Sequence, residues 1–136
     1  MKDNSKLVIW TEDLDKDFQS GGEIVHALKK VNIRIMPGRL TILRGRSGSG
    51  KTTLINLLGG LDTPSAGKVF FKGMQISNMP ALKRDEIRRT DFGFVFQSIA
   101  IISIMSAYEN VEFGLRVAGY NPACRKERAE ECLKLV

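Results

Sequence analysis

The sequence has 136 residues, of which 43% are hydrophobic and 26% charged, and this balance excludes an intrinsically disordered chain. The formal net charge is +6, but the basic residues are dispersed and their one dense cluster, residues 83–89, is interrupted by Asp85 and Glu86, so we do not expect nucleic-acid binding. The most apolar stretch, residues 99–105, is far shorter than the roughly 20 residues that a membrane-spanning helix needs, so any membrane role is expected to come through a partner.

The N-terminal third predicts antiparallel β structure. An apolar run at residues 7–10 predicts a short strand, and the small residues at 20–22 predict a loop with a hairpin-like return. Alternating apolar and polar residues at 31–35 predict a half-buried strand, and the Pro-Gly pair at 37–38 supplies a turn after it.

The next part of the chain predicts a strand, a glycine-rich loop and a helix in direct succession. The apolar residues 40–43 predict a buried strand that leads into the loop at 45–52. A helix is expected over residues 53–58, where a glycine pair ends it. A further strand is predicted at 69–71.

The rest of the chain predicts one more strand and three helices. Proline at position 80 favours a helix that runs to about Arg89, and residues 92–96 predict a strand that ends at Gln97. Apolar or small residues at helical spacing after Ser106 predict an amphipathic helix, and a second helix is expected after the Asn-Pro pair at 121–122. That last helix has no capping signal at its end, so we expect the domain to be incomplete.

The loop GRSGSGKT at residues 45–52 satisfies the phosphate-binding pattern G-x-x-x-x-G-K-[ST]. Glycines let the backbone curl around an anion, its N–H groups point inward, and the following helix adds its positive end. Lys51 is expected to reach the β- and γ-phosphates of ATP, Thr52 to offer its hydroxyl to Mg²⁺, and Thr53 to touch the α-phosphate. The expected nucleotide contacts in this loop are Gly45, Ser47, Gly48, Ser49, Gly50, Lys51, Thr52 and Thr53.

A glycine-rich turn that happens to precede a lysine is the alternative interpretation of this loop. The predicted strand before it and the predicted helix after it favour a true nucleotide site, because the pattern then stands in its usual structural context. A P-loop kinase or GTPase and a non-catalytic nucleotide-binding module stay open as alternative functions.

Three segments together resemble one family. Residues 45–73 (GRSGSGKTTLINLLGGLDTPSAGKVFFKG) resemble the corresponding part of ABC-transporter ATPases, residues 91–98 (DFGFVFQS) look like the family's Q-loop region, and residues 107–115 (AYENVEFGL) resemble the start of its helical subdomain. The resemblance leans toward the lipoprotein-releasing, macrolide-exporting and cell-division-type group, and it covers essentially residues 7–136.

This resemblance implies an α/β fold: the P-loop NTPase core of an ABC ATPase, with an N-terminal antiparallel β subdomain and the start of a helical subdomain. All 136 residues are expected to be the N-terminal part of one such domain, divided into a β subdomain and P-loop core at about 1–97 and a helical part at about 98–136.

The resemblance also implies roles for two residues outside the loop. Gln97 would contact Mg²⁺ and the attacking water, which makes it a catalytic residue together with Lys51, and it would couple the site to the membrane partner. An ordinary polar residue at a strand end is the alternative. Phe18 matches the aromatic residue that stacks on adenine, although the family more often has tyrosine there and a core phenylalanine is the competing interpretation.

Neither the family's LSGGQ-like signature motif nor its acidic strand with the catalytic glutamate occurs in these 136 residues. We therefore expect ATP binding by this chain, and ATP hydrolysis by a longer parent protein that contains those groups. The expected partners are transmembrane permease subunits and a second ATPase subunit in a homodimer of the full-length domain. The expected location is cytoplasmic, at the inner face of the membrane, in line with two cysteines whose spacing fits neither a redox pair nor a zinc site.

Overall fold

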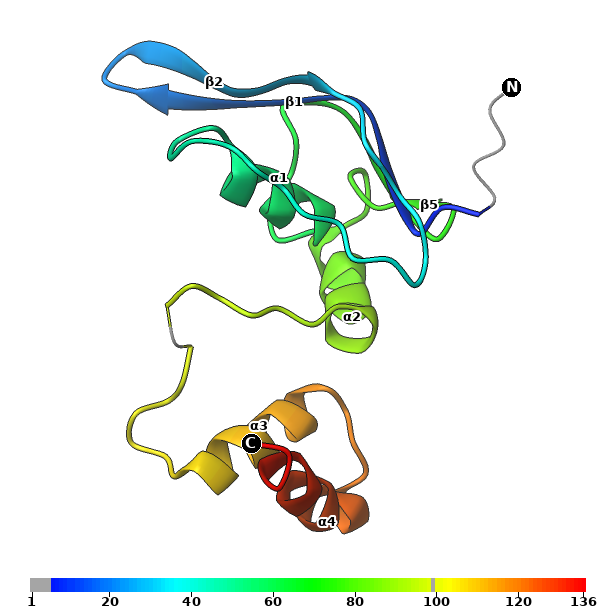
Figure 1. Ribbon diagram of the computed structural model, residues 1–136, viewed down its shortest axis with the longest axis vertical. Helices are drawn as coiled ribbons and strands as arrows, with labels where there is room; N and C mark the ends of the chain where they lie inside the picture. Colours follow the sequence, from blue (N-terminus) through cyan, green and yellow to red (C-terminus); the bar gives the residue numbers. More distant parts are fainter. Residues whose placement is uncertain (1–5, 99) are drawn as a thin grey trace. The chain divides into compact units, whose positions relative to one another are not determined.

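The computed structural model describes residues 6–98 and 100–136 (Figure 1). Two compact units make up the chain, the first ending at Asp85 and the second beginning at Glu86, so their boundary falls within one helix. The subdomain division predicted near residue 97 stays a prediction. In chain order the elements are β1 (Ile9–Ser20), β2 (Glu23–Val31), β3 (Arg34–Ile35), α1 (Lys51–Leu58), β4 (Ala66–Phe71), β5 (Met74–Gln75), α2 (Ala81–Asp91), α3 (Ala107–Val117) and α4 (Pro122–Leu133). Among the described residues, no helix combines the length and apolar character needed to cross a membrane.

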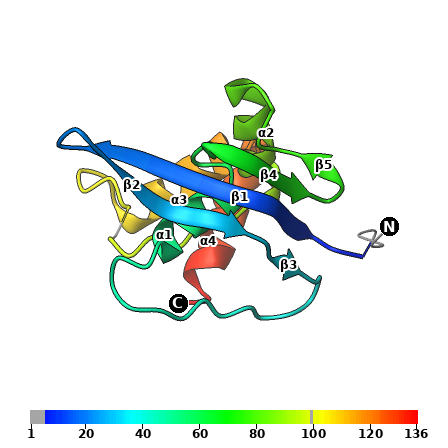
Figure 2. The same ribbon diagram turned by 90° about the horizontal axis from the view of Figure 1, so that it is seen from above.

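The first unit is built on an antiparallel sheet in the order β2-β1-β4-β5, with β3 also paired to β1, so that β1 lies between β2 and β4 (Figure 2). Gly21 and Gly22 join β1 to β2 with φ values of 59° and 86°, a left-handed conformation that glycine adopts without strain. The predicted hairpin is confirmed, but β1 is longer than expected because it includes the acidic residues before the turn.

The strand predicted at residues 31–35 is interrupted in the middle, where side chains replace the strand ladder. The Thr11 hydroxyl donates to the Val31 carbonyl at 2.8 Å and accepts from the Ile33 N–H at 3.0 Å. The Asn32 amide pairs with Asp13, donating to its carboxylate and accepting from its backbone N–H, both at 2.9 Å. These bonds satisfy the backbone locally, so β2 ends at Val31 and β3 begins two residues after Asn32.

The core of the first unit combines one face of α1 with the inner face of the sheet. Leu57 of α1 is 1% exposed, Leu54 and Leu58 are also buried, and Leu14 and Val69 from the strands are inaccessible or nearly so. Full burial of such a side chain contributes about 1.5–3 kcal/mol to stability. The predicted helix is confirmed and starts two residues earlier than expected, at Lys51.

Two predicted strands are wrong: residues 40–43 and 92–96 have irregular backbone. Their apolar side chains lie open, with Leu40 89% and Val95 102% exposed. A strand forms only where a neighbour supplies hydrogen-bond partners, and the strand pairings of the described residues involve β1 to β5 alone. An apolar run favours a buried strand, but it does not supply the neighbour that the strand needs.

The second unit contains α3 and α4, and both predicted helices are confirmed, as is the predicted α2. Ser106 and Glu109 form a capping box at the start of α3, in which each side chain bonds to the other residue's backbone N–H. Its hydrogen bonds to Ser106 hold the pKa of the Glu109 carboxyl below its ordinary value. Asn121 caps α4, and Ala129 is fully buried where α4 packs on α3.

The Asn110 side chain fixes the segment that enters α3. Its amide oxygen accepts from the Ile102 N–H at 2.8 Å, and its amide nitrogen donates to the carbonyls of Ile102, Met105 and Ser106 at 3.1, 3.2 and 3.0 Å. One side chain thus satisfies four backbone groups of an irregular segment, residues 102–106, which would otherwise depend on water.

We expect Asn110→Ala to loosen residues 102–106 selectively, lowering the free energy of local opening by about 1–3 kcal/mol because these backbone groups lose their partner. Asn110→Asp should act more strongly, since its carboxylate would face three carbonyl oxygens. Amide hydrogen exchange at Ile102 is the measurement, and Asn121→Ala, which removes a single capping bond elsewhere in the unit, is the matched control. Unchanged exchange at Ile102 in Asn110→Ala would contradict the assignment.

Candidate nucleotide-binding site

The loop at residues 45–52 leads directly into α1. Gly48 and Gly50 have φ values of 78° and 82°, so the curl of the loop uses a conformation that other residues rarely adopt. The Ser49 N–H donates to the Arg46 carbonyl at 3.2 Å and closes the bend. Ser47, Gly48 and Ser49 are exposed, so the tip of the loop is open to a ligand.

Gly50 lies against the backbone of β2. A Cβ atom at this position would come within 2.6 Å of the Ala27 carbonyl oxygen and 3.0 Å of a Leu28 methyl carbon. At Gly45 a Cβ would lie 2.5 Å from the Ser49 hydroxyl. Both fixed glycines of the pattern are therefore required by close approach, and Gly50 also ties the loop to the sheet.

The N-terminus of α1 has the properties of an anion site. Gly50 is the N-cap residue and supplies no side-chain cap, and the first turn contains no acidic residue. The first bond back to the cap is the one from the Leu54 N–H to the Gly50 carbonyl at 2.8 Å. The N–H groups of Lys51, Thr52 and Thr53 have no acceptor within the helix, so their partial positive charge is available to an anion.

Lys51 closes the loop on itself. Its ammonium group donates to the carbonyls of Gly45 and Arg46, both at 2.8 Å, and approaches the Ser49 hydroxyl at 3.4 Å. An ammonium group has three donors, so these contacts use all of them. Lys51 therefore lies inside the curve of the loop, on the side where a phosphate would bind.

Thr52 and Thr53 follow in the first turn of α1, where Thr52 is exposed and Thr53 half-buried. The part of the chain that the structure describes contains no group of three or more His, Cys, Asp or Glu residues that could hold a metal ion. A hydroxyl such as that of Thr52 fits Mg²⁺, because this ion is commonly held by few protein oxygens together with phosphate oxygens and waters.

Phe18 lies on β1 opposite Val25 and is 44% exposed, so it is not a core phenylalanine. The Lys16 ammonium lies 5.1 Å from the centre of its ring. That ammonium also forms an ion pair with Asp62 at 2.8 Å and donates to the Thr63 carbonyl at 2.8 Å. The sequence prediction did not include Lys16, although its place two residues before Phe18 is a usable signal for a shared strand face.

The charge environment of Asp62 reflects this contact. Burial by itself would raise the pKa of the Asp62 carboxyl. The hydrogen bonds from Lys16 and from the Thr63 backbone, with the positive charges of Lys16 and Arg84, outweigh that effect and hold the pKa below its ordinary value. Asp62 therefore remains a carboxylate well into the acid range.

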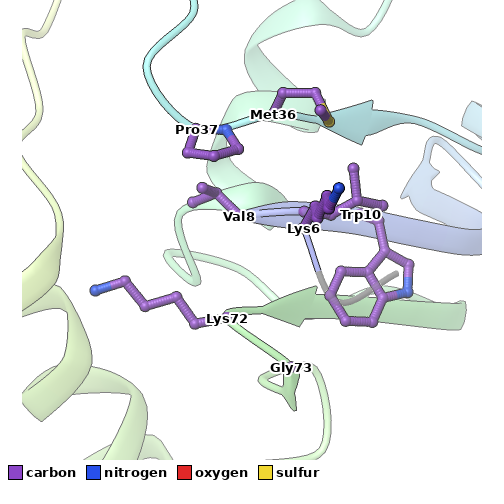
Figure 3. Close-up of a pocket in the computed structure, with 8 residues that line it drawn as sticks. Lys6, Val8, Trp10, Met36, Pro37, Lys72 and Gly73 are labelled. Carbon is purple, nitrogen blue, oxygen red and sulfur yellow. The ribbon is translucent and has the colours of Figure 1, made fainter. Parts of the chain in front are cut away.

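Gln97 lies in the second compact unit, in an irregular segment, and is exposed. The structure thus brings the loop residues and α1 together within one unit, with Phe18 in the same unit, and leaves the role of Gln97 a prediction. A pocket of about 660 Å³, lined by residues such as Val8, Trp10 and Lys72, contains none of the predicted site residues (Figure 3). The chemistry of the loop, rather than the volume of a cavity, identifies the candidate site.

Comparison with known proteins places this geometry in a family. Residues 28–136 match the ABC transporter family. The chain is 46% identical over 129 residues to the macrolide export ATP-binding/permease protein MacB of Marinobacter nauticus, covering 93% of this chain and 20% of MacB. It is 38% identical over 122 residues to the lipoprotein-releasing system ATP-binding protein LolD of Idiomarina loihiensis, covering 90% of this chain and 54% of LolD. The chain thus spans between about a fifth and about half of the length of these relatives.

Solved structures show the same fold. The dimeric ATP-binding cassette MJ0796 in a post-hydrolysis state, bound to ADP and Pi, matches with a TM-score of 0.85 and 36% identity, over 93% of this chain and 56% of that one. MJ0796 is an ABC transporter ATP-binding protein of Methanocaldococcus jannaschii. The predicted α/β fold class is confirmed by this likeness, despite the two strands that are irregular here. The loop geometry, the family match and the shared fold agree, and the chain belongs to the ABC transporter family, in the part that forms its ATP-binding cassette.

Proposed function

We propose that the chain binds Mg-ATP through residues 45–53 and that a longer protein containing it hydrolyses ATP to drive a membrane transporter. The observation that carries this proposal is the arrangement of Lys51 beside the uncapped N-terminus of α1, which gathers a cation and free amide donors around one loop. Phosphate groups are the ligands that such an arrangement suits best.

Each residue has a defined task in this proposal. Lys51 exchanges the carbonyls of Gly45 and Arg46 for oxygens of the β- and γ-phosphates, while the first-turn amides of α1 bind the remaining phosphate oxygens. Thr52 holds Mg²⁺ by its hydroxyl, and Thr53 contacts the α-phosphate. Bound Mg²⁺ bridges the phosphate oxygens and neutralises part of their charge.

The two residues outside the loop complete the proposed site. Phe18 stacks on adenine by the exposed part of its ring, which is a sequence-tolerant contact that needs only an aromatic face. Gln97, near the metal and the attacking water, connects the site to the membrane partner.

Hydrolysis requires groups that these 136 residues do not include, namely a signature motif and a glutamate that orients water. We therefore propose that this chain binds ATP without turning it over. The names of MacB and LolD support a permease and an export or extraction role for the longer protein, located at the cytoplasmic face of a membrane. The dimeric state of MJ0796 supports pairing with a second cassette. The family match argues against a P-loop kinase or GTPase.

Lys51→Ala is expected to weaken Mg-ATP binding at least tenfold, because hydrogen bonds from a charged group contribute about 1.5–3 kcal/mol. Isothermal titration calorimetry on the purified chain measures the effect. Lys68→Ala is the matched control, since Lys68 lies on an exposed part of β4 and pairs only loosely with Glu12, at 3.7 Å. Equal affinity of Lys51→Ala and the unmodified chain would contradict the proposed site.

Gly50→Ala is expected to destabilise the first unit and to weaken Mg-ATP binding with it. Alanine at φ 82° costs about 1–2 kcal/mol by itself, and the contact with the Ala27 carbonyl adds to this cost. Gly38→Ala is the control, because Gly38 has φ 66° but open surroundings and therefore reports the conformational cost alone. Chemical denaturation compares the two variants; equal losses of stability would show that the approach to β2 is unimportant.

Phosphate release from ATP tests the binding-only part of the proposal. We expect release by the 136-residue chain to match the background given by its Lys51→Ala variant under conditions where calorimetry shows ATP bound. Release above that background, and abolished by Lys51→Ala, would mean that the chain carries its own catalytic groups.

A further inference from the structure

Lys16 is unusually enclosed for a lysine on an otherwise open hairpin. Its side chain is only 12% exposed, whereas Phe18 two residues later on the same strand is 44% exposed. Three contacts account for the enclosure: the Asp62 carboxylate and the Thr63 carbonyl at 2.8 Å each, and the Phe18 ring at 5.1 Å from its centre.

The partners of Lys16 are themselves fixed. The Asp62 carboxylate accepts from the Thr63 N–H at 2.7 Å, and the Asp62 N–H donates back to the Asn56 carbonyl of α1 at 3.4 Å. The same turn is joined to β1 by a bond from the Ser65 N–H to the Asp15 carbonyl at 2.9 Å. Lys16 therefore holds a defined position between the turn that follows α1 and the aromatic ring.

This position places a cation over one face of the Phe18 ring. An aromatic ring has two equivalent faces, and an ammonium group within about 6 Å of the centre is attracted to the face it covers. With one face covered by Lys16 and the side chain still 44% exposed, the opposite face is the one available for stacking.

We propose that Lys16 is a positioning residue for the nucleobase: it covers one face of Phe18, fixes the ring through its bonds to Asp62 and Thr63, and leaves the other face for the purine. This inference rests on the proposed function, since it assigns Phe18 to the base. The Asp62 carboxylate neutralises the Lys16 ammonium, so Lys16 orients the ring without acting as a second phosphate-binding cation.

The test separates base binding from phosphate binding. Calorimetry with Mg-ATP and, separately, with magnesium tripolyphosphate compares the unmodified chain with Lys16→Met, which keeps the length of the side chain but removes its charge. We expect Lys16→Met to weaken ATP binding about two- to fivefold, which is the size of a cation–π contact, and to leave tripolyphosphate binding unchanged. Lys16→Arg should restore ATP affinity, and Lys68→Met, which removes a strand lysine elsewhere on the sheet, should not change it.

A double-mutant cycle with Phe18→Leu shows whether Lys16 acts through the ring. In the Phe18→Leu background, Lys16→Met should cause no further loss of ATP affinity. An undiminished loss there, or an equal loss for tripolyphosphate, would overturn the positioning role and show a direct contact with phosphate. ATP affinity unchanged by Lys16→Met would also overturn it, whereas failure of the unmodified chain to bind either ligand would contradict the proposed function itself.

Discussion

The close approach of Gly50 to the backbone of β2 is the contact on which the geometry of the first unit depends. No side-chain atom fits between this residue and the Ala27 carbonyl, so the loop and the hairpin touch through their backbones. The helix begins immediately after this contact, and its direction places Leu54, Leu57 and Leu58 in the core. The phosphate loop is thus held by the packing of the unit, and its shape follows from the same burial that stabilises the sheet.

Features that depend on neighbours in the sequence were predictable. The glycine pair at 21–22 produces the hairpin, and the loop glycines lie where left-handed backbone is needed. Ser106 and Asn121 begin the two last helices because their side chains bond to backbone N–H groups only two or three residues away. Short-range chemistry of this kind acts in the same way whatever the rest of the molecule does.

Features that depend on distant residues were not predictable. The apolar segments 40–43 and 92–96 have the composition of strands, but composition does not specify a neighbour in the sheet. The bond from Lys16 to the Thr63 carbonyl joins residues 47 positions apart, and no spacing rule connects them. The loop residues of the candidate site were accessible to sequence reasoning because they are contiguous, whereas the support behind Phe18 required the fold.

Lys51 also determines which anions can compete for the loop. Its three donors already contact oxygen atoms of its own loop, so an incoming anion must displace partners of similar geometry before it gains anything. A small monovalent ion replaces one contact with another and derives little benefit. A polyphosphate engages the ammonium group and the first-turn amides of α1 at the same time, which a chain carbonyl cannot do. The closed resting loop therefore acts as a filter, rejecting the abundant simple anions of a cell in favour of ligands with several linked phosphate groups.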